Sequence, residues 1–147
     1  MGVWRHALAP RCMNDAAARY RTLCPGRFFL DPEDRAGVEF YLRERGWLAP
    51  GERVLSLGRA GEGNMNCTLC VMTSARSVIV KQSRPWVEKY PQFAAPGDRV
   101  CREAEFYRLV ETRAAVTGLM PRVLGFDAEG RVQENAVAAG KGGHAGP

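Results

Sequence analysis

Residues that build metal sites and disulfide frameworks are scarce in this 147-residue sequence. It has two histidines, His6 and His144, near its two ends, and five irregularly spaced cysteines. Cys67 and Cys70 have the spacing of half a zinc site, but no second pair follows, and residues three apart on a strand point to opposite faces. An odd number of irregularly spaced cysteines also argues against a secreted disulfide framework. We therefore expect no metal site and reduced thiols, as in a cytoplasmic protein.

Long apolar runs are also missing. No stretch approaches the roughly 20 apolar residues of a transmembrane helix, and residues 3–8 are too short for a signal-peptide core, so we expect no membrane partner. The net charge is +5, but the arginines are spread along the chain and do not alternate with aromatic residues. This distribution argues against nucleic acid as a partner. The composition, 46% apolar and 25% charged, is that of one ordinary globular domain.

The most informative stretch runs from residue 54 to residue 81. An apolar run at 54–57 leads into glycines at positions 58, 61 and 63, and two further β-type runs at 66–73 and 77–80 end at Lys81. Glycine lets backbone N–H groups approach a polyanion closely, and a lysine on the neighbouring strand can pair with phosphate oxygens. The pattern predicts a flap over phosphates. The alternative is a plain hairpin whose lysine ends a strand in solvent.

Two better-known glycine motifs do not fit this stretch. A dinucleotide fingerprint needs glycines that open a helix, whereas these glycines are spaced G-x-x-G-x-G and followed by residues that form helices poorly. A P-loop ends in Gly-Lys-Ser or Gly-Lys-Thr, but Gly140-Lys141 is followed by Gly142. Neither motif therefore explains the glycines.

Two amphipathic helices are predicted on either side of this stretch. Asp31, followed by Pro32, is expected to cap a helix that runs to Arg45. Asp98 is expected to cap a second helix that runs to about residue 115 and buries a stripe at 100, 104 and 107. Glu103 lies beside that stripe, either as a solvated charge or as a partner for Lys81.

The rest of the chain is predicted from weaker signals. Residues 1–27 read as a partly flexible N-terminal extension with a short helix at 14–23, and residues 28–132 read as the folded domain. Residues 82–96, with three prolines, are expected to be irregular. Strands are expected at 121–127 and from 131. Residues 133–147 are rich in Gly and Ala without apolar periodicity, which predicts a disordered tail.

An ordered series of four segments carries a family resemblance: GEGNMN, VIVKQSRPWVEKYP, APGDRVCREAEFY and MPRVLGFD. From about residue 28 to residue 132 the chain resembles the N-terminal lobe of the aminoglycoside phosphotransferase family, in particular the methylthioribose kinase branch. The resemblance implies a protein-kinase-like α+β lobe, with a packed helix on an antiparallel sheet of about five strands, and ATP as cofactor. It implies that the loop over the nucleotide holds Gly61, Gly63 and Asn64, that Ile79 touches the adenine, and that Lys81 holds the α- and β-phosphates and pairs with Glu103.

The sequence departs from that family after the first lobe. The family's catalytic aspartate and its magnesium-binding residues lie in a C-terminal lobe, and no H-x-D motif occurs here. The segment Gln133-Glu134-Asn135-Ala136 also stands where an apolar hinge is expected. We therefore expect a truncated or frame-shifted product, or one half of a split protein, without catalytic residues. Its magnesium and small-molecule hydroxyl substrate would belong to a protein with both lobes. A non-catalytic nucleotide-binding or interaction module is the alternative.

Overall fold

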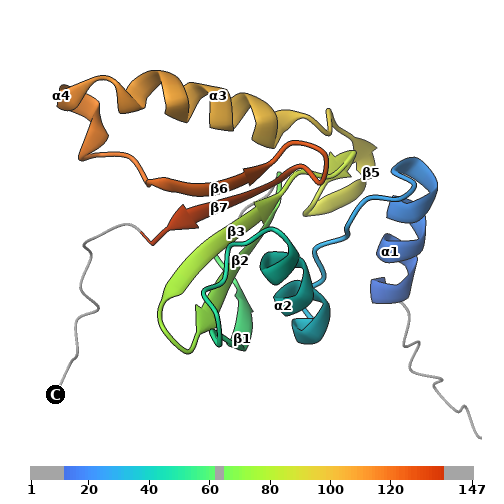
Figure 1. The fold of residues 1–147 in the computed structure, drawn as a ribbon. Helices are drawn as coiled ribbons and strands as arrows, with labels where there is room; N and C mark the ends of the chain where they lie inside the picture. Colours follow the sequence, from blue (N-terminus) through green and yellow to red (C-terminus); the bar gives the residue numbers. More distant parts are fainter. Residues whose placement is uncertain (1–11, 62–64, 138–147) are drawn as a thin grey trace, which may run out of the picture.

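The computed structural model describes residues 12–61 and 65–137, which form a mixed α+β fold (Figure 1). Gly63 and Asn64 lie outside the described residues. The helices are α1 (Cys12–Leu23), α2 (Arg35–Glu44), α3 (Arg99–Glu111) and α4 (Ala114–Thr117). The strands are β1 (Val54–Arg59), β2 (Cys67–Thr73), β3 (Ser77–Gln82), β4 (Trp86–Val87), β5 (Tyr90–Ala94), β6 (Val123–Asp127) and β7 (Val132–Ala136).

Five strands form one antiparallel sheet in the order β1-β2-β3-β7-β6. The predicted antiparallel sheet of about five strands is therefore confirmed. The strand β7 lies between β3 and β6, although the β4–β5 hairpin and helices α3 and α4 separate it from β3 along the chain. This order makes β3 the central strand of the sheet instead of an edge strand.

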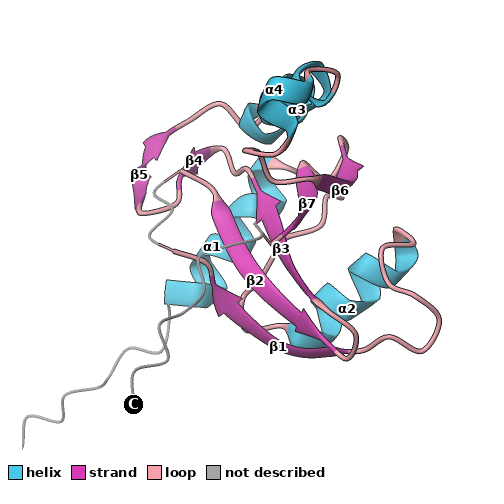
Figure 2. Ribbon diagram, turned by 90° about the vertical axis from the view of Figure 1, so that its left-hand side faces the viewer, coloured by secondary structure: helices cyan, strands magenta, loops and turns pink. Residues whose placement is uncertain are grey.

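The two faces of the sheet carry different helices (Figure 2). On β3, Val78 and Val80 join a core that includes Val38 and Leu42 of α2. Because side chains alternate along a strand, Ile79 and Lys81 point to the other face, and Lys81 meets α3 there. No helix in the described ranges is long and apolar enough to span a membrane.

The predicted cap of α2 is wrong, whereas the predicted start of α3 is confirmed in position only. The N-cap of α2 is Asp34, whose Oδ1 accepts a hydrogen bond from the Gly37 amide at 2.9 Å, whereas Asp31 stabilises the preceding turn by accepting from the Glu33 amide. Asp98 occupies the N-cap position of α3 without a capping hydrogen bond, and its side chain binds Arg102 at 3.0 Å. A carboxylate held by an arginine one turn ahead is not free to turn back to the helix amides.

The segment 82–96 is more regular than predicted, because it contains the β4–β5 hairpin. Trp86, at the start of this hairpin, is buried against Tyr20 of α1, with ring centroids 6.1 Å apart in an edge-on arrangement. Arg19 of α1 covers the Trp86 ring at 4.7 Å. The helix predicted at 14–23 is thus confirmed as α1, and it packs against the domain through a second small core.

The prediction of a disordered tail from residue 133 is wrong at its beginning. Gln133, Glu134 and Asn135 are 0%, 2% and 1% exposed and belong to β7. Their backbone pairs with β3 on one side and β6 on the other. Position inside the sheet, and not side-chain hydrophobicity, therefore orders this segment. Residues 138–147 lie outside the described part of the chain.

Glu134 belongs to a buried ionic cluster on the α2 side of the sheet. Arg76 lies 3.1 Å from Glu52 and 3.5 Å from Glu134. Burial alone would raise the pKa of Glu52, but hydrogen bonds from the Ala49 amide, the Thr73 hydroxyl and Arg76 bring it below its usual value. Burial raises the pKa of Glu134 to about 7, because Arg76 only partly offsets the lost hydration and Glu52 opposes ionisation. The two carboxylates that share Arg76 therefore differ in pKa, which is lowered for Glu52 and raised for Glu134.

Candidate functional site

The candidate site lies on the α3 face of the sheet, where β3 brings Ile79 and Lys81 together. In the strand register Lys81 stands between Thr68 of β2 and Gln133 of β7, and Ile79 stands between Cys70 and Asn135. Directly opposed residues share a face. Polar side chains therefore surround Lys81, while Ile79 supplies apolar surface one pleat away, as the alternation predicted.

Lys81 and Glu103 form the ion pair that the sequence predicted. Lys81 Nζ lies 2.7 Å from Glu103 Oε1. Helix α3 buries Val100, Ala104 and Tyr107, which brings Glu103 to the rim of the contact between helix and sheet. The two side chains remain 22% and 26% exposed. The pair is therefore partly shielded from water but still open to a ligand.

Tyr107 extends this pair along α3, and the sequence reading assigned it only to the apolar stripe. Its hydroxyl donates to Glu103 Oε1 at 3.0 Å. Burial, followed by the hydrogen bond and the charge of Glu103, raises the pKa of Tyr107 to about 12, so it remains a donor at neutral pH. The four-residue spacing between positions 103 and 107, which brings side chains together on a helix, was the signal available in the sequence.

The turn between β1 and β2 approaches the start of α3. Gly61 has a φ of +66°, a conformation that glycine adopts without strain, and it is exposed. Beyond the undescribed residues 62–64, Met65 and Asn66 accept hydrogen bonds from Arg99 in the first turn of α3. The described part of the turn therefore lies at the end of the sheet where β3 delivers Lys81. Arg99 had no role in the sequence reading.

Two buried amides on β7 complete the polar side of the site. Gln133 Nε2 donates to Asn135 Oδ1 at 2.7 Å, and Gln133 Oε1 is buried without a hydrogen-bond partner among the described residues. Both residues lie in the segment whose sequence predicts a disordered tail. Nothing in the residue types of this segment predicts burial, because the burial of Gln133 and Asn135 depends on the pairing of β7 with β3.

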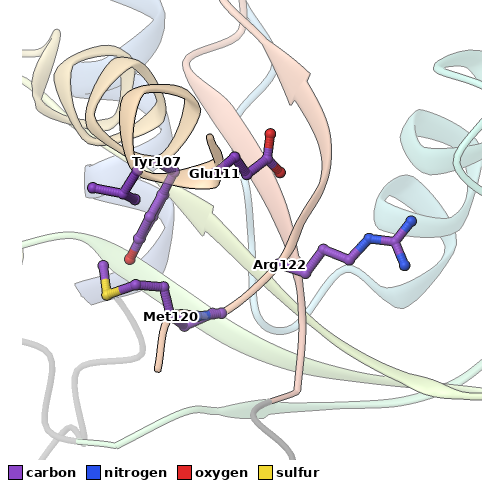
Figure 3. Close-up of a pocket in the computed structure, with 6 residues that line it drawn as sticks. Tyr107, Glu111, Met120 and Arg122 are labelled. Atoms are coloured by element: carbon purple, nitrogen blue, oxygen red, sulfur yellow. The ribbon is translucent and has the colours of Figure 1, made fainter. Parts of the chain in front are cut away.

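A cavity of about 230 Å³ lies farther along α3, beyond Tyr107. Figure 3 shows the Tyr107 ring reaching from the helix toward the Met120 segment, while the Arg122 side chain points away from the ring. Apolar groups make up most of the wall, so the cavity suits an uncharged group. Its lining residues are Tyr107, Val110, Glu111, Met120, Pro121 and Arg122.

The chemistry available at the site is anion binding. The ammonium group of Lys81 has three N–H donors. Because it donates to Glu103 Oε1, this ammonium group is held in a fixed direction. Partly exposed ion pairs contribute about 0–1 kcal/mol to stability, so this pair adds little to the free energy of unfolding. Within residues 12–61 and 65–137, no three His, Cys, Asp or Glu side chains are grouped as metal ligands.

No protein-family model matches the sequence, and no curated protein is significantly similar to it.

Proposed function

We propose that this chain is the nucleotide-binding lobe of an ATP-dependent small-molecule phosphotransferase of the aminoglycoside phosphotransferase type. The observation that carries the proposal is the 2.7 Å ion pair between Lys81 of the third strand and Glu103 of the helix that follows the β4–β5 hairpin. In protein kinases a lysine on the third strand and a helix glutamate form the pair that positions ATP phosphates, beneath a glycine-rich loop.

Three further features support the proposal. The glycine-rich turn joins the first two strands and ends beside α3, where Arg99 binds Met65. Ile79 lies next to Lys81 on the same face and supplies a surface for the base. Both charged side chains of the pair are partly exposed, so a phosphate can reach Lys81. In this assignment Lys81 contacts the α- and β-phosphates, Glu103 orients Lys81, and the turn with Gly61, Gly63 and Asn64 covers the nucleotide.

The proposed role is binding and not turnover by these 147 residues. Phosphoryl transfer needs carboxylates that hold magnesium and a residue that positions the attacking hydroxyl, and the sequence contains no H-x-D motif. Magnesium, the acceptor alcohol and the catalytic aspartate are therefore assigned to a second lobe. The chain is expected to bind the nucleotide and to transfer no phosphate to methylthioribose or aminoglycosides.

The test is titration of the full chain with ATP and magnesium by calorimetry. Lys81→Ala should weaken binding about tenfold or more, because it removes a charge-assisted contact to phosphate. Lys89→Ala is the matched control, since Lys89 is an exposed lysine near the hairpin turn, and it should change the affinity less than twofold. Binding that does not depend on Lys81, or no binding at all, would refute the proposal. Turnover abolished by Lys81→Ala would refute the assignment of catalysis to a second lobe.

A further inference from the structure

The guanidinium of Arg99 joins the return limb of the glycine-rich turn to the start of α3. Nε donates to Asn66 Oδ1 at 3.2 Å, and Nη2 donates to the Met65 carbonyl at 2.6 Å. The same guanidinium also reaches the approach to the β4–β5 hairpin and the loop before the helix. These additional acceptors are the carbonyls of Arg84 at 3.2 Å, Trp86 at 3.3 Å and Pro96 at 2.6 Å.

This arrangement suits a residue that fixes geometry. The planar guanidinium has five N–H donors in a rigid fork, so it can hold several carbonyls in one orientation, as a lysine ammonium cannot. Loss of hydration lowers the pKa of Arg99, and the charge of Asp98 only partly offsets this effect. A neighbouring hydrogen bond also fixes the start of α3. The Val100 amide donates to Ser83 Oγ at 3.4 Å, just beyond the end of β3.

Arg99 and Glu103 are four residues apart and therefore lie on one side of α3, one turn above the other. Arg99 binds the glycine-rich turn, and Glu103 binds Lys81. We propose that Arg99 is a positioning residue that sets the end of the glycine-rich turn and the direction of Glu103 together. Its importance for nucleotide affinity rests on the proposed function, whereas the mechanical link between the turn and the ion pair does not.

The mechanical link is tested without nucleotide by the rate at which acetic anhydride acylates Lys81, followed by peptide mass spectrometry. Arg99→Gln should release Glu103 and raise the rate at Lys81 about threefold to fivefold, as expected for loss of a partly exposed ion pair. The rate at exposed Lys89 is the internal reference and should not change. Arg102→Gln is the matched control, because it removes the same charge from an arginine that is 77% exposed and binds Asp98.

Amide hydrogen exchange gives the second readout of the link. In Arg99→Gln the peptide that covers residues 65–70 and the peptide that covers the first turn of α3 should both exchange faster than in Arg102→Gln. An unchanged acylation rate at Lys81, or faster exchange in α3 alone, would overturn the proposal. If circular dichroism shows that Arg99→Gln does not fold, Arg99→Lys takes its place, since it keeps the charge and removes the fork.

The nucleotide arm uses the same variants with ATP and magnesium. Arg99→Gln should weaken binding about tenfold, and in a Glu103→Gln background the same change should weaken it less than about twofold, because the two residues act through one contact. Equal effects in both backgrounds would overturn the role through Glu103. If the unsubstituted chain binds no nucleotide, the proposed function fails, and the acylation and exchange rates still decide the link.

Discussion

Replacing Glu134 by glutamine should change how the stability of this domain depends on pH. Glu134 is 2% exposed and shares Arg76 with Glu52. Its pKa in the fold is about 7, compared with an ordinary value of 4.5. The folded state therefore holds a proton at this position in a pH range where the unfolded chain has lost it.

The sign and the magnitude follow from this difference. Between pH 4.5 and pH 7 the folded state binds more protons at Glu134 than the unfolded state, so the free energy of unfolding falls as the pH rises. The contribution is complete below pH 4.5 and lost above pH 7. At about 1.4 kcal/mol per pKa unit, the change from 4.5 to about 7 corresponds to about 3 kcal/mol. Glutamine cannot ionise, so Glu134→Gln should lack this fall.

Urea unfolding between pH 4.5 and pH 8, followed by tryptophan fluorescence, measures the effect. The unfolding free energy of Glu134→Gln minus that of the original chain should rise by about 3 kcal/mol over this range. Taking the difference removes the opposite trend of Asp127, whose pKa is lowered in the fold and which shares no partner with Glu134. The control Glu129→Gln alters an exposed turn and should stay within about 0.5 kcal/mol at every pH. A difference for Glu134→Gln that does not vary with pH would refute the reasoning.

Three further predictions test the packing. Trp86→Ala should lower the unfolding free energy by about 3–5 kcal/mol, because it empties the second core; a loss below 1 kcal/mol in urea unfolding would contradict that role. Gly125→Ala would place a β-carbon 2.5 Å from Trp47 Cε2 and should cost about 1–3 kcal/mol with a shift in tryptophan emission; unchanged emission and stability would contradict the contact. In the native protein Cys67, which is fully buried with a pKa raised by burial to about 11, should react with iodoacetamide far more slowly than Cys70; equal rates by peptide mass spectrometry would contradict its burial.

The residues around Lys81 show what could be predicted from the sequence. Alternation along β3 fixed the shared face of Ile79 and Lys81, and helical spacing placed Glu103 beside the buried stripe of α3. These are local rules, and the pair at 2.7 Å follows from combining them. The α+β fold and the antiparallel sheet could be predicted for the same reason. The role of the pair in nucleotide binding stays a prediction.

Most features that could not be predicted depend on residues distant in sequence and not on local rules. Gln133 and Asn135 are ordered because β3 and β6 flank them, although nothing in their own composition favours burial. Arg99 is important through acceptors that only the folded chain brings within reach of its long side chain. The cap of α2 is a miss of another, local kind: Asp31 was predicted, but Asp34, three residues closer to the helix, caps it.

The position of β7 between β3 and β6 also has a consequence for the order of folding. The β1-β2-β3 meander and the β6–β7 hairpin consist of contacts between strands that are neighbours in sequence, whereas the pairing of β3 with β7 closes a long loop that contains α3. Long-range pairing carries the loop-closure entropy and slows folding. The meander and the hairpin are therefore expected to form before they join, and the environment of Lys81 is completed only when β7 docks beside it.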